Sequence, residues 1–204
     1  MKIIAVGMNY PDHIKELDSK TPKEPVLFMK PDSSLVKNNK PFFIPSFSSE
    51  IHYETELIVR IDRLGKNISE KFASRYYSSI GIGIDFTARD VQRTLRADGN
   101  PWEVAKAFDG SAVISDFYPL VDFGNDIEAL HFSLNLNGKL VQKGFTGDMI
   151  FNVNEIIAYA SKFFTLKIGD ILFTGTPVGV GSVTINDHIE GYLEDKKMLD
   201  FMVK

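Results

Sequence analysis

The sequence IHYETELIVRI, residues Ile51 to Ile61, decides most of what can be predicted about this chain. Its hydrophobic residues recur at every second position, a period that is typical of a half-buried β-strand. Glu54 and Glu56 then lie on the same, more polar face, with Cα atoms roughly 6.5–7 Å apart. Two like charges at that distance repel by about 2 kcal/mol at an effective dielectric constant near 20. A cation between them would remove that repulsion.

A second predicted strand, GIGID, runs from Gly81 to Asp85 and ends in a third carboxylate. Mg²⁺ and Ca²⁺ bind carboxylate oxygens and leave positions free for water or a substrate. The three carboxylates therefore predict a divalent metal site. The alternative is an ordinary solvated strand face, for which a Glu-x-Glu pattern alone is common. Thr87 follows the second strand and is expected to cap a helix over Ala88 to Ala97.

Length and composition indicate one folded domain over residues 1–204, with 44% hydrophobic and 25% charged residues. A net charge of -4 argues against a nucleic-acid partner, which needs an excess of Lys and Arg. The absence of Cys excludes disulfides, thiolate nucleophiles and cysteine-ligated clusters. No apolar run reaches the length of a signal-peptide core or a membrane span, so no membrane partner and a cytoplasmic location are expected.

A turn and a helix are expected from Asn9 to Lys20, with Pro11 near the first helical position. His13 and Glu16 are three residues apart and share one face of that helix. The carboxylate could orient the imidazole and raise its basicity, which suits activation of a water molecule. The alternative is a solvated surface pair of little energetic value.

Two further groups of polar residues are predicted near the carboxylates. Arg89 and Gln92 lie one turn apart on the helix after Asp85 and would suit recognition of an anionic substrate, unless they form a solvated face. Lys106, among apolar residues, either extends its head to water or is a partly buried cation beside the acidic cluster.

The later part of the chain is predicted to be mostly strands. A hairpin covers His131 to Val141, with Asn137 and Gly138 as its two-residue turn. An amphipathic helix covers Asn152 to Thr165, with Asn152 as its cap and Phe163 and Phe164 on its apolar side. The glycine-rich run from Gly169 to Gly181 matches no nucleotide-binding motif, but its amides and the Thr176 hydroxyl could bind a carboxylate.

Taken together, seven ordered segments resemble the fumarylacetoacetate hydrolase family. They extend from Gly7 to about Gly181 and read NYPDHIKE, FMKP, HYETEL, GIDFTARDVQ, AKAFD, NGKLVQ and TGTPVGVG. The resemblance implies a mixed α+β, predominantly β fold, namely the β-roll or sandwich of the catalytic domain of that family, with a few short helices. It also implies a homodimer.

The same resemblance implies roles for nine residues. A metal, expected to be Mg²⁺ with Mn²⁺ or Ca²⁺ as alternatives, is held by Glu54, Glu56 and Asp85. His13 and Glu16 form a water-activating dyad on a mobile lid, and Lys106 is the third catalytic residue. The residues that match substrate-contacting positions are Arg89, Gln92 and Thr176.

The expected function is therefore that of a metal-dependent enzyme for small 2-oxo acids. Hydrolysis of a carbon–carbon bond in an acylpyruvate and decarboxylation of oxaloacetate both pass through an enolate that a metal can stabilise. An isomerase, tautomerase or hydratase of 2-hydroxy-dienoate acids is the alternative. A non-catalytic, metal-stabilised binding module is a more remote one.

Overall fold

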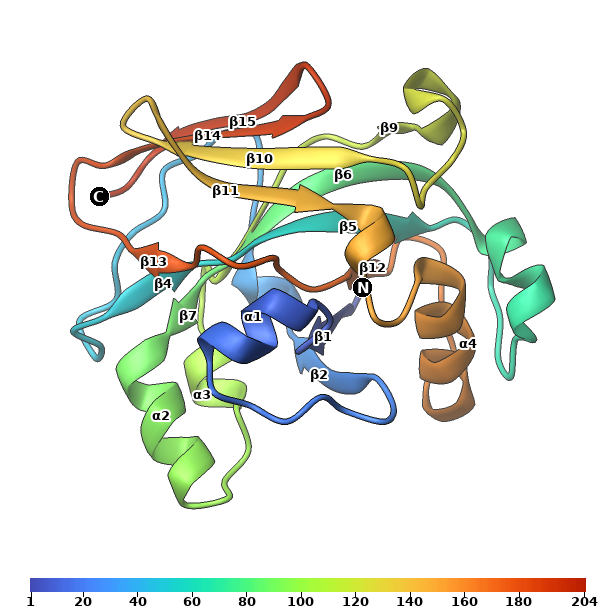
Figure 1. Cartoon of the computed structure of the whole chain (residues 1–204), viewed down its shortest axis with the longest axis horizontal. Coiled ribbons are helices and arrows are strands. Elements are labelled where there is room, and N and C mark those ends of the chain that lie inside the picture. The colour runs from blue at the N-terminus through green and yellow to red at the C-terminus, as the bar shows by residue number, and fades with distance from the viewer.

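The computed structural model describes all residues from Met1 to Lys204, and its largest element is an eight-stranded sheet. Seven of its strands follow the order β2-β1-β12-β5-β6-β8-β3, and β9 pairs with β6 (Figure 1). Most neighbours are antiparallel, while β1 pairs with β12 and β3 with β8 in parallel. The strands are β1 (Ile3–Gly7), β2 (Val26–Lys30), β3 (Leu35–Val36), β5 (Thr55–Ile61), β6 (Tyr77–Asp85), β8 (Ala112–Ile114), β9 (Tyr118–Pro119) and β12 (Ile171–Phe173).

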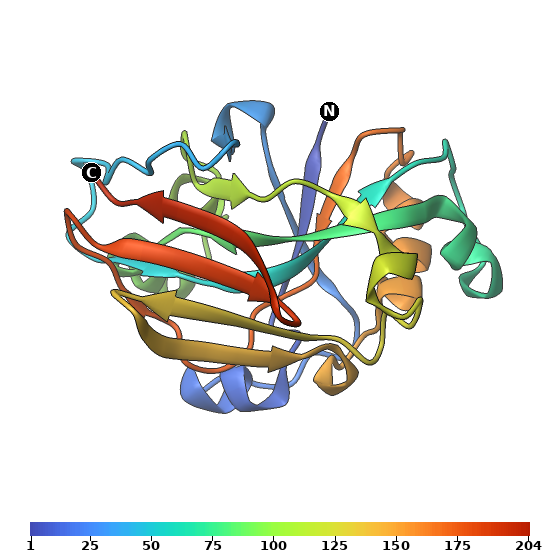
Figure 2. The same ribbon diagram turned by 90° about the horizontal axis from the view of Figure 1, so that it is seen from above.

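A four-stranded antiparallel sheet in the order β11-β10-β14-β15 packs over β5 and β6 (Figure 2). Its first hairpin turns at Asn137 and Gly138, whose φ angles of 52° and 76° confirm the predicted two-residue turn. The strands are β10 (His131–Leu136), β11 (Lys139–Phe145), β14 (His188–Leu193) and β15 (Lys196–Met202). The strand-rich, mixed α+β architecture predicted from the sequence is therefore confirmed.

Strand β5 is buried on both faces, which corrects the prediction of a half-buried strand. Leu57 and Val59 belong to a core cluster of 36 buried residues, to which the four-stranded sheet also contributes. Ile58 points the other way, into a separate cluster of seven buried residues that includes Phe173. The second cluster lies on the face that the sequence predicts to be polar, where apolar residues of β1, β8 and β12 in the same sheet pack with Ile58.

The predicted continuous strand from Ile51 to Ile61 is interrupted at Glu54. The residues before the break form β4, which pairs with β13 and β7 in a small three-stranded sheet, and the residues after it form β5. The bounds of the small sheet are β4 (Ile51–Tyr53), β7 (Thr87–Ala88) and β13 (Gly181–Ser182). The break places Glu54 where the two sheets diverge.

Four α-helices complete the fold: α1 (Pro11–Glu16), α2 (Arg89–Ala97), α3 (Glu103–Lys106) and α4 (Val153–Phe163). Figure 1 shows α1, α2 and α3 on the side of the large sheet away from the four-stranded sheet. Short 3₁₀ helices cover Asp32–Ser34, Glu70–Tyr76, Leu120–Phe123 and Thr146–Asp148. No helix combines the length and the hydrophobicity that a membrane-spanning segment requires.

The predicted helix caps are present at some helix ends and absent at others. Asn152 caps α4 through a reciprocal capping box with Glu155, as predicted. Phe163 was predicted on the buried side of this helix but is 57% exposed; it is the last residue of the helix, and the next residue, Phe164, packs against the core. Thr87 does not cap α2; it lies in β7, and its hydroxyl contacts the acidic cluster instead. Helix α1 begins at Pro11, as predicted, but is shorter than expected.

Candidate metal and substrate site

Glu54, Glu56 and Asp85 converge in the interior of the protein, and we refer to them as the acidic triad. Each offers a carboxylate oxygen, and these oxygens all lie within 4.8 Å of one another. Antiparallel pairing of β5 with β6 brings them together, since the Asp85 N–H donates to the Glu54 carbonyl at 2.8 Å. All three side chains are buried. The predicted proximity of the three residues is confirmed, and their burial rules out the alternative of an ordinary solvated strand face.

Lys106 bridges two members of the triad. Its Nζ lies 2.7 Å from Glu54 Oε2, 2.7 Å from Asp85 Oδ2 and 2.6 Å from Thr87 Oγ1. Burial lowers the pKa of this ammonium, but the two carboxylates outweigh burial and leave the pKa raised. Of the two interpretations of Lys106, the buried cation beside the acidic cluster is therefore confirmed.

Lys30 is a second buried cation at the triad, and sequence reasoning missed it. Its Nζ lies 2.6 Å from Asp85 Oδ1 and donates a hydrogen bond to Ser111 Oγ at 2.9 Å. Burial lowers the pKa of Lys30, and Asp85 offsets part of that shift. The available signal was its position at the end of a hydrophobic strand, directly before Pro31 in the FMKP segment. A lysine that ends a strand is usually solvated, so the local pattern favoured no site.

The triad has the properties of a divalent-cation site. Glu56 is 1% exposed and has no cationic partner; its Oε2 accepts a hydrogen bond from the Gly175 N–H at 2.6 Å. Burial, Asp85 and Glu54 raise the pKa of Glu56 well above its ordinary value. Asp85 Oδ1, although close to Lys30, lacks a partner with hydrogen-bond geometry. A buried carboxylate without a counterion, beside an oxygen with free acceptor capacity, fits a hard cation such as Mg²⁺ or Mn²⁺.

Arg89 lies beside the triad and is held by three partners. Its guanidinium contacts Glu54 Oε1 at 2.5 Å and Gln92 Oε1 at 2.5 Å, and its Nε donates to His52 Nδ1 at 3.3 Å. The opposite nitrogen of His52 lies 2.8 Å from Glu50 Oε1. Arg89 and Gln92 are 4% and 5% exposed, so they do not form the solvated face that was the alternative. Their contact with a substrate stays a prediction.

His13 and Glu16 form a close pair on α1. His13 Nδ1 lies 2.9 Å from Glu16 Oε2, while Glu16 Oε1 accepts a hydrogen bond from the Gly179 N–H at 3.1 Å. His13 is only 4% exposed. Burial raises the pKa of Glu54, but Lys106, Arg89 and His13 together outweigh burial, so the pKa of Glu54 is lowered overall. His13 therefore lies within electrostatic reach of the triad. The pair is therefore not a solvated surface pair.

Thr176 lies behind the strand that carries the glutamates. Its hydroxyl donates to the Thr55 carbonyl at 2.9 Å and accepts from Gln142 Nε2 at 3.0 Å. This hydroxyl is thus engaged by the protein, and its contact with a substrate stays a prediction. Gln142 is a buried residue that sequence reasoning also missed; its only local signal is membership in the NGKLVQ segment.

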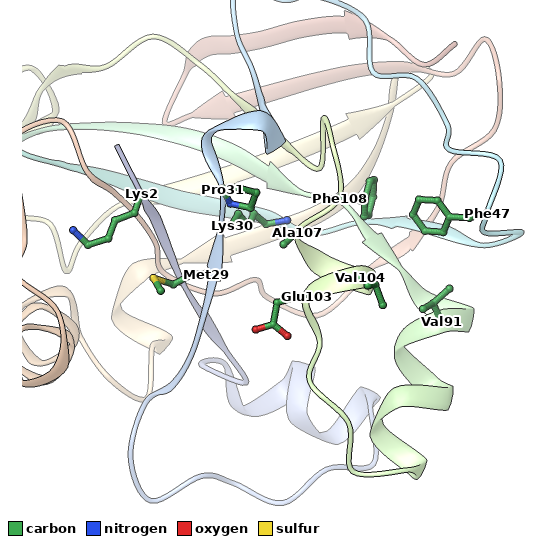
Figure 3. A pocket seen from close by; sticks show the side chains of 10 residues that line it. All are labelled: Lys2, Met29, Lys30, Pro31, Phe47, Val91, Glu103, Val104, Ala107 and Phe108. Atoms are coloured by element: carbon green, nitrogen blue, oxygen red, sulfur yellow. The ribbon is translucent and has the colours of Figure 1, made fainter.

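An open, mainly apolar groove of about 920 Å³ lies next to the acidic triad, with Lys30 among its lining residues (Figure 3). Val91 comes from α2, Val104 and Glu103 come from α3, and Met29 comes from β2. Lys30 directs its ammonium to Asp85, and Glu103 is the one carboxylate of the lining. The groups with the chemistry of a metal and substrate site thus converge at the triad and not in the groove.

Several proteins with a named activity are similar in sequence to this chain over nearly its whole length. Residues 2–203 match the fumarylacetoacetate (FAA) hydrolase C-terminal family. An oxaloacetate tautomerase of Escherichia coli (strain K12) is 44% identical over 188 residues, which are 92% of this chain and 86% of the relative. A mitochondrial oxaloacetate tautomerase of Mus musculus is 41% identical over 202 residues, which are 99% of this chain and 91% of the relative.

Solved structures show the same fold. A fumarylacetoacetate hydrolase family protein from Yersinia pestis CO92 has a TM-score of 0.96 at 41% identity, covering 100% of this chain and 93% of the other. The fumarylpyruvate hydrolase from Pseudomonas aeruginosa, solved in complex with Mn²⁺ and pyruvate, has a TM-score of 0.93 at 34% identity, covering 100% of this chain and 89% of the other. The chain is therefore a member of the fumarylacetoacetate hydrolase family.

Proposed function

We propose that this protein is a divalent-metal-dependent enzyme that interconverts the keto and enol forms of oxaloacetate or a closely similar 2-oxo dicarboxylate. The observation that carries the proposal is the buried acidic triad, in which Glu56 lacks a counterion while three cations surround its two neighbours. The two tautomerases at 44% and 41% identity support this substrate class.

The metal would be held by Glu54, Glu56 and Asp85, with Mg²⁺ as the expected ion and Mn²⁺ as an alternative. A bound divalent ion supplies Lewis-acid stabilisation of negative charge that develops on the 2-oxo oxygen. Arg89 and Lys106 add fixed positive charge on the same side of the site, because both contact Glu54. These two residues would bind and orient the anionic substrate.

His13 is the proton carrier in this proposal. Glu16 lies against Nδ1, so the Nε2 nitrogen is left free to take a proton from the carbon next to the 2-oxo group. Delivery of that proton to the 2-oxo oxygen gives the enol. In the reverse direction the proton passes from the enol O–H to the carbon, so neither direction gains or loses atoms. Glu16 orients the ring and stabilises its charged form, and the Gly179 N–H fixes Glu16. The burial of His13 would limit the contact of bulk water with this proton transfer.

Hydrolysis of an acylpyruvate is the second candidate function. The His13–Glu16 pair favours it, because the same free nitrogen could deprotonate a water molecule. The fumarylpyruvate hydrolase at a TM-score of 0.93 also supports it. Decarboxylation of oxaloacetate is a third outcome of the same arrangement, because it needs enolate stabilisation but no attack by water.

A substrate panel separates these activities. Purified protein with Mg²⁺ or Mn²⁺ should accelerate the change in ultraviolet absorbance that accompanies ketonisation of enol-oxaloacetate, and Glu56→Gln should lose the acceleration. Acylpyruvate cleavage and release of CO₂ from oxaloacetate are measured in parallel on the same preparation. Absence of all three activities, in protein that binds Mn²⁺, would leave a metal-stabilised binding module and refute the proposed enzyme.

The assembly and the cellular location are part of the proposal. A homodimer is implied by the family resemblance, and light scattering should then give twice the chain mass of 22.9 kDa. A monomeric mass at working concentration would contradict this. The cytoplasmic location stays a prediction, which fractionation of the source cells would test.

A further inference from the structure

We propose that Gln142 is a positioning residue that holds Glu54 and Glu56 in their metal-binding arrangement and couples them to helix α1. Gln142 lies in β11 of the four-stranded sheet and is 2% exposed. Its side chain hydrogen-bonds to neither the triad nor the His13–Glu16 pair, so any effect on them must act through other residues. The inference rests on the proposed function only in assuming that the triad binds a metal.

The first link runs from Gln142 to the peptide between the two glutamates. The Thr55 N–H donates to Gln142 Oε1 at 3.0 Å, and the Thr55 carbonyl accepts from Thr176 Oγ1 at 2.9 Å. Side chains from two distant segments thus hold both polar groups of this backbone residue. Because Glu54 and Glu56 flank Thr55, a rotation of the backbone here would move both carboxylates. The position is sensitive, since β4 ends and β5 begins at this point.

The second link runs from Gln142 to the loop between β12 and β13. Gln142 Nε2 donates to Thr176 Oγ1 at 3.0 Å and to the Pro177 carbonyl at 3.0 Å. The amide therefore uses its oxygen and its nitrogen at the same time, in one orientation. A flipped amide would set its NH₂ group against the Thr55 N–H. Gln142 consequently joins this loop rigidly to the strand that carries the glutamates.

The same loop touches the triad at one end and α1 at the other. The Gly175 N–H donates to Glu56 Oε2 at 2.6 Å, and the Gly179 N–H donates to Glu16 Oε1 at 3.1 Å. Gly179 has φ +102°, and a Cβ there would lie 2.6 Å from the Val141 carbonyl oxygen, so the loop lies directly against β11. Gln142 holds the middle of this loop. A displacement of the loop would therefore change the support of Glu56 and of Glu16 together.

Metal affinity distinguishes this role from that of an ordinary buried hydrogen-bonding residue. Groups that orient metal ligands typically change metal affinity by about 10–100-fold when they are removed. A residue that only stabilises the fold changes the melting temperature but leaves the affinity of the folded protein unchanged. Ser161 is the matched control: it is buried on α4, and its hydroxyl accepts from the Ile68 N–H at 2.8 Å and donates to the Ala158 carbonyl at 2.9 Å.

The test is calorimetric titration of Mn²⁺ into the wild type, Q142M, T176V and S161A, on protein shown to be folded by thermal melting. Q142M should raise the Kd for Mn²⁺ about tenfold. T176V should raise it by less, because the Thr55 N–H keeps its acceptor. S161A should leave it unchanged. If Q142M does not fold, T176V decides in the same way.

Hydrogen–deuterium exchange on the same proteins tests the coupling to α1. Exchange over residues 11–16 and 175–179 should increase in Q142M and not in S161A. An unchanged Kd in folded Q142M, an equal loss of affinity in S161A, or unchanged exchange over both segments would overturn the inference. If the wild type itself fails to bind Mn²⁺, the proposed function falls, and this inference falls with it.

Discussion

Replacing Glu56 by glutamine is expected to change thermal stability in opposite directions with and without a divalent metal. The substitution keeps the shape of the side chain and the acceptor for the Gly175 N–H, but removes a buried charge that has no counterion. In EDTA the variant should therefore melt at a higher temperature than the wild type. With Mn²⁺ the wild type should melt at the higher temperature, because the variant lacks one of the three carboxylates.

The size of the effect follows from the distances in the triad. Unit charges on carboxylate oxygens within 4.8 Å of one another repel by at least about 3.5 kcal/mol per pair at an effective dielectric constant near 20. Lys30, Lys106 and Arg89 contact the other two carboxylates and offset much of this repulsion. We expect a net gain of about 1–2 kcal/mol for the variant in EDTA, or roughly 2–8 °C. Mn²⁺ at about 100 times its Kd should add about 2.7 kcal/mol to the wild type alone.

The pH dependence of the stability difference between Glu56→Gln and the wild type tests the sign of that difference independently. Burial, Asp85 and Glu54 raise the pKa of Glu56 in the folded protein, so its charge becomes increasingly costly to folding as pH rises above the ordinary carboxyl range. The advantage of Glu56→Gln in EDTA should therefore grow between about pH 5 and about pH 8. Differential scanning calorimetry over this range provides the measurement. Glu70→Gln, an exposed change of the same net charge, is the control. A variant that is less stable than the wild type in EDTA at all pH values would refute the reasoning.

Three further outcomes are expected from single substitutions. Lys106→Met should destabilise the metal-free protein by about 3–5 kcal/mol, because it leaves two buried carboxylates without their shared cation. Urea unfolding in EDTA measures this loss, and a loss below about 1 kcal/mol would contradict the expectation. His13→Gln should slow turnover by about 10²–10⁴-fold with an unchanged Kd for Mn²⁺, as steady-state kinetics and titration can check, and a parallel loss of metal binding would assign the residue a structural role. Asp90→Ala should lower the free energy of unfolding by about 1 kcal/mol, since Asp90 accepts hydrogen bonds from Ser48 and Ser49 at the start of α2. Burial raises the pKa of Asp90, but these hydrogen bonds outweigh burial and lower the pKa to about 2. The difference in unfolding free energy from the wild type should therefore persist at neutral pH and shrink as pH falls from about 4 towards 2. A pH-independent difference would refute the assignment.

Local patterns predicted those parts of the fold that depend on neighbouring residues. The Asn137–Gly138 turn needs positive φ angles that these two residue types adopt readily, and the Asn152 cap needs only Glu155 three residues later. The spacing of Glu54 and Glu56 and the position of Asp85 at the end of β6 are also local features, but the pairing of β5 with β6 that brings the three together is not.

Features that depend on distant segments could not be predicted from local patterns. Ile58, on the face of β5 that the alternation marks as polar, is buried in a cluster with Ile3 and Phe173, which lie far from it in the sequence. Lys30 and Asp85 are brought together by tertiary packing, and the Lys30 ammonium also contacts the Lys106 carbonyl and Ser111. Thr87 has the sequence context of a helix cap, but the buried Glu54 and Lys106 compete for its hydroxyl more strongly than the helix does.

The charges at the triad have a consequence for the order of events in binding. Lys30, Lys106 and Arg89 contact two of the three carboxylates, Glu54 and Asp85, and Glu56 is the third, so the centre has no net charge when all six groups are ionised. A divalent ion alone would leave two positive charges in a buried space, and a dicarboxylate alone would leave two negative ones. Together they restore neutrality. Each should therefore raise the affinity of the other by the same factor, so that the enzyme takes up metal and substrate as a thermodynamically linked pair.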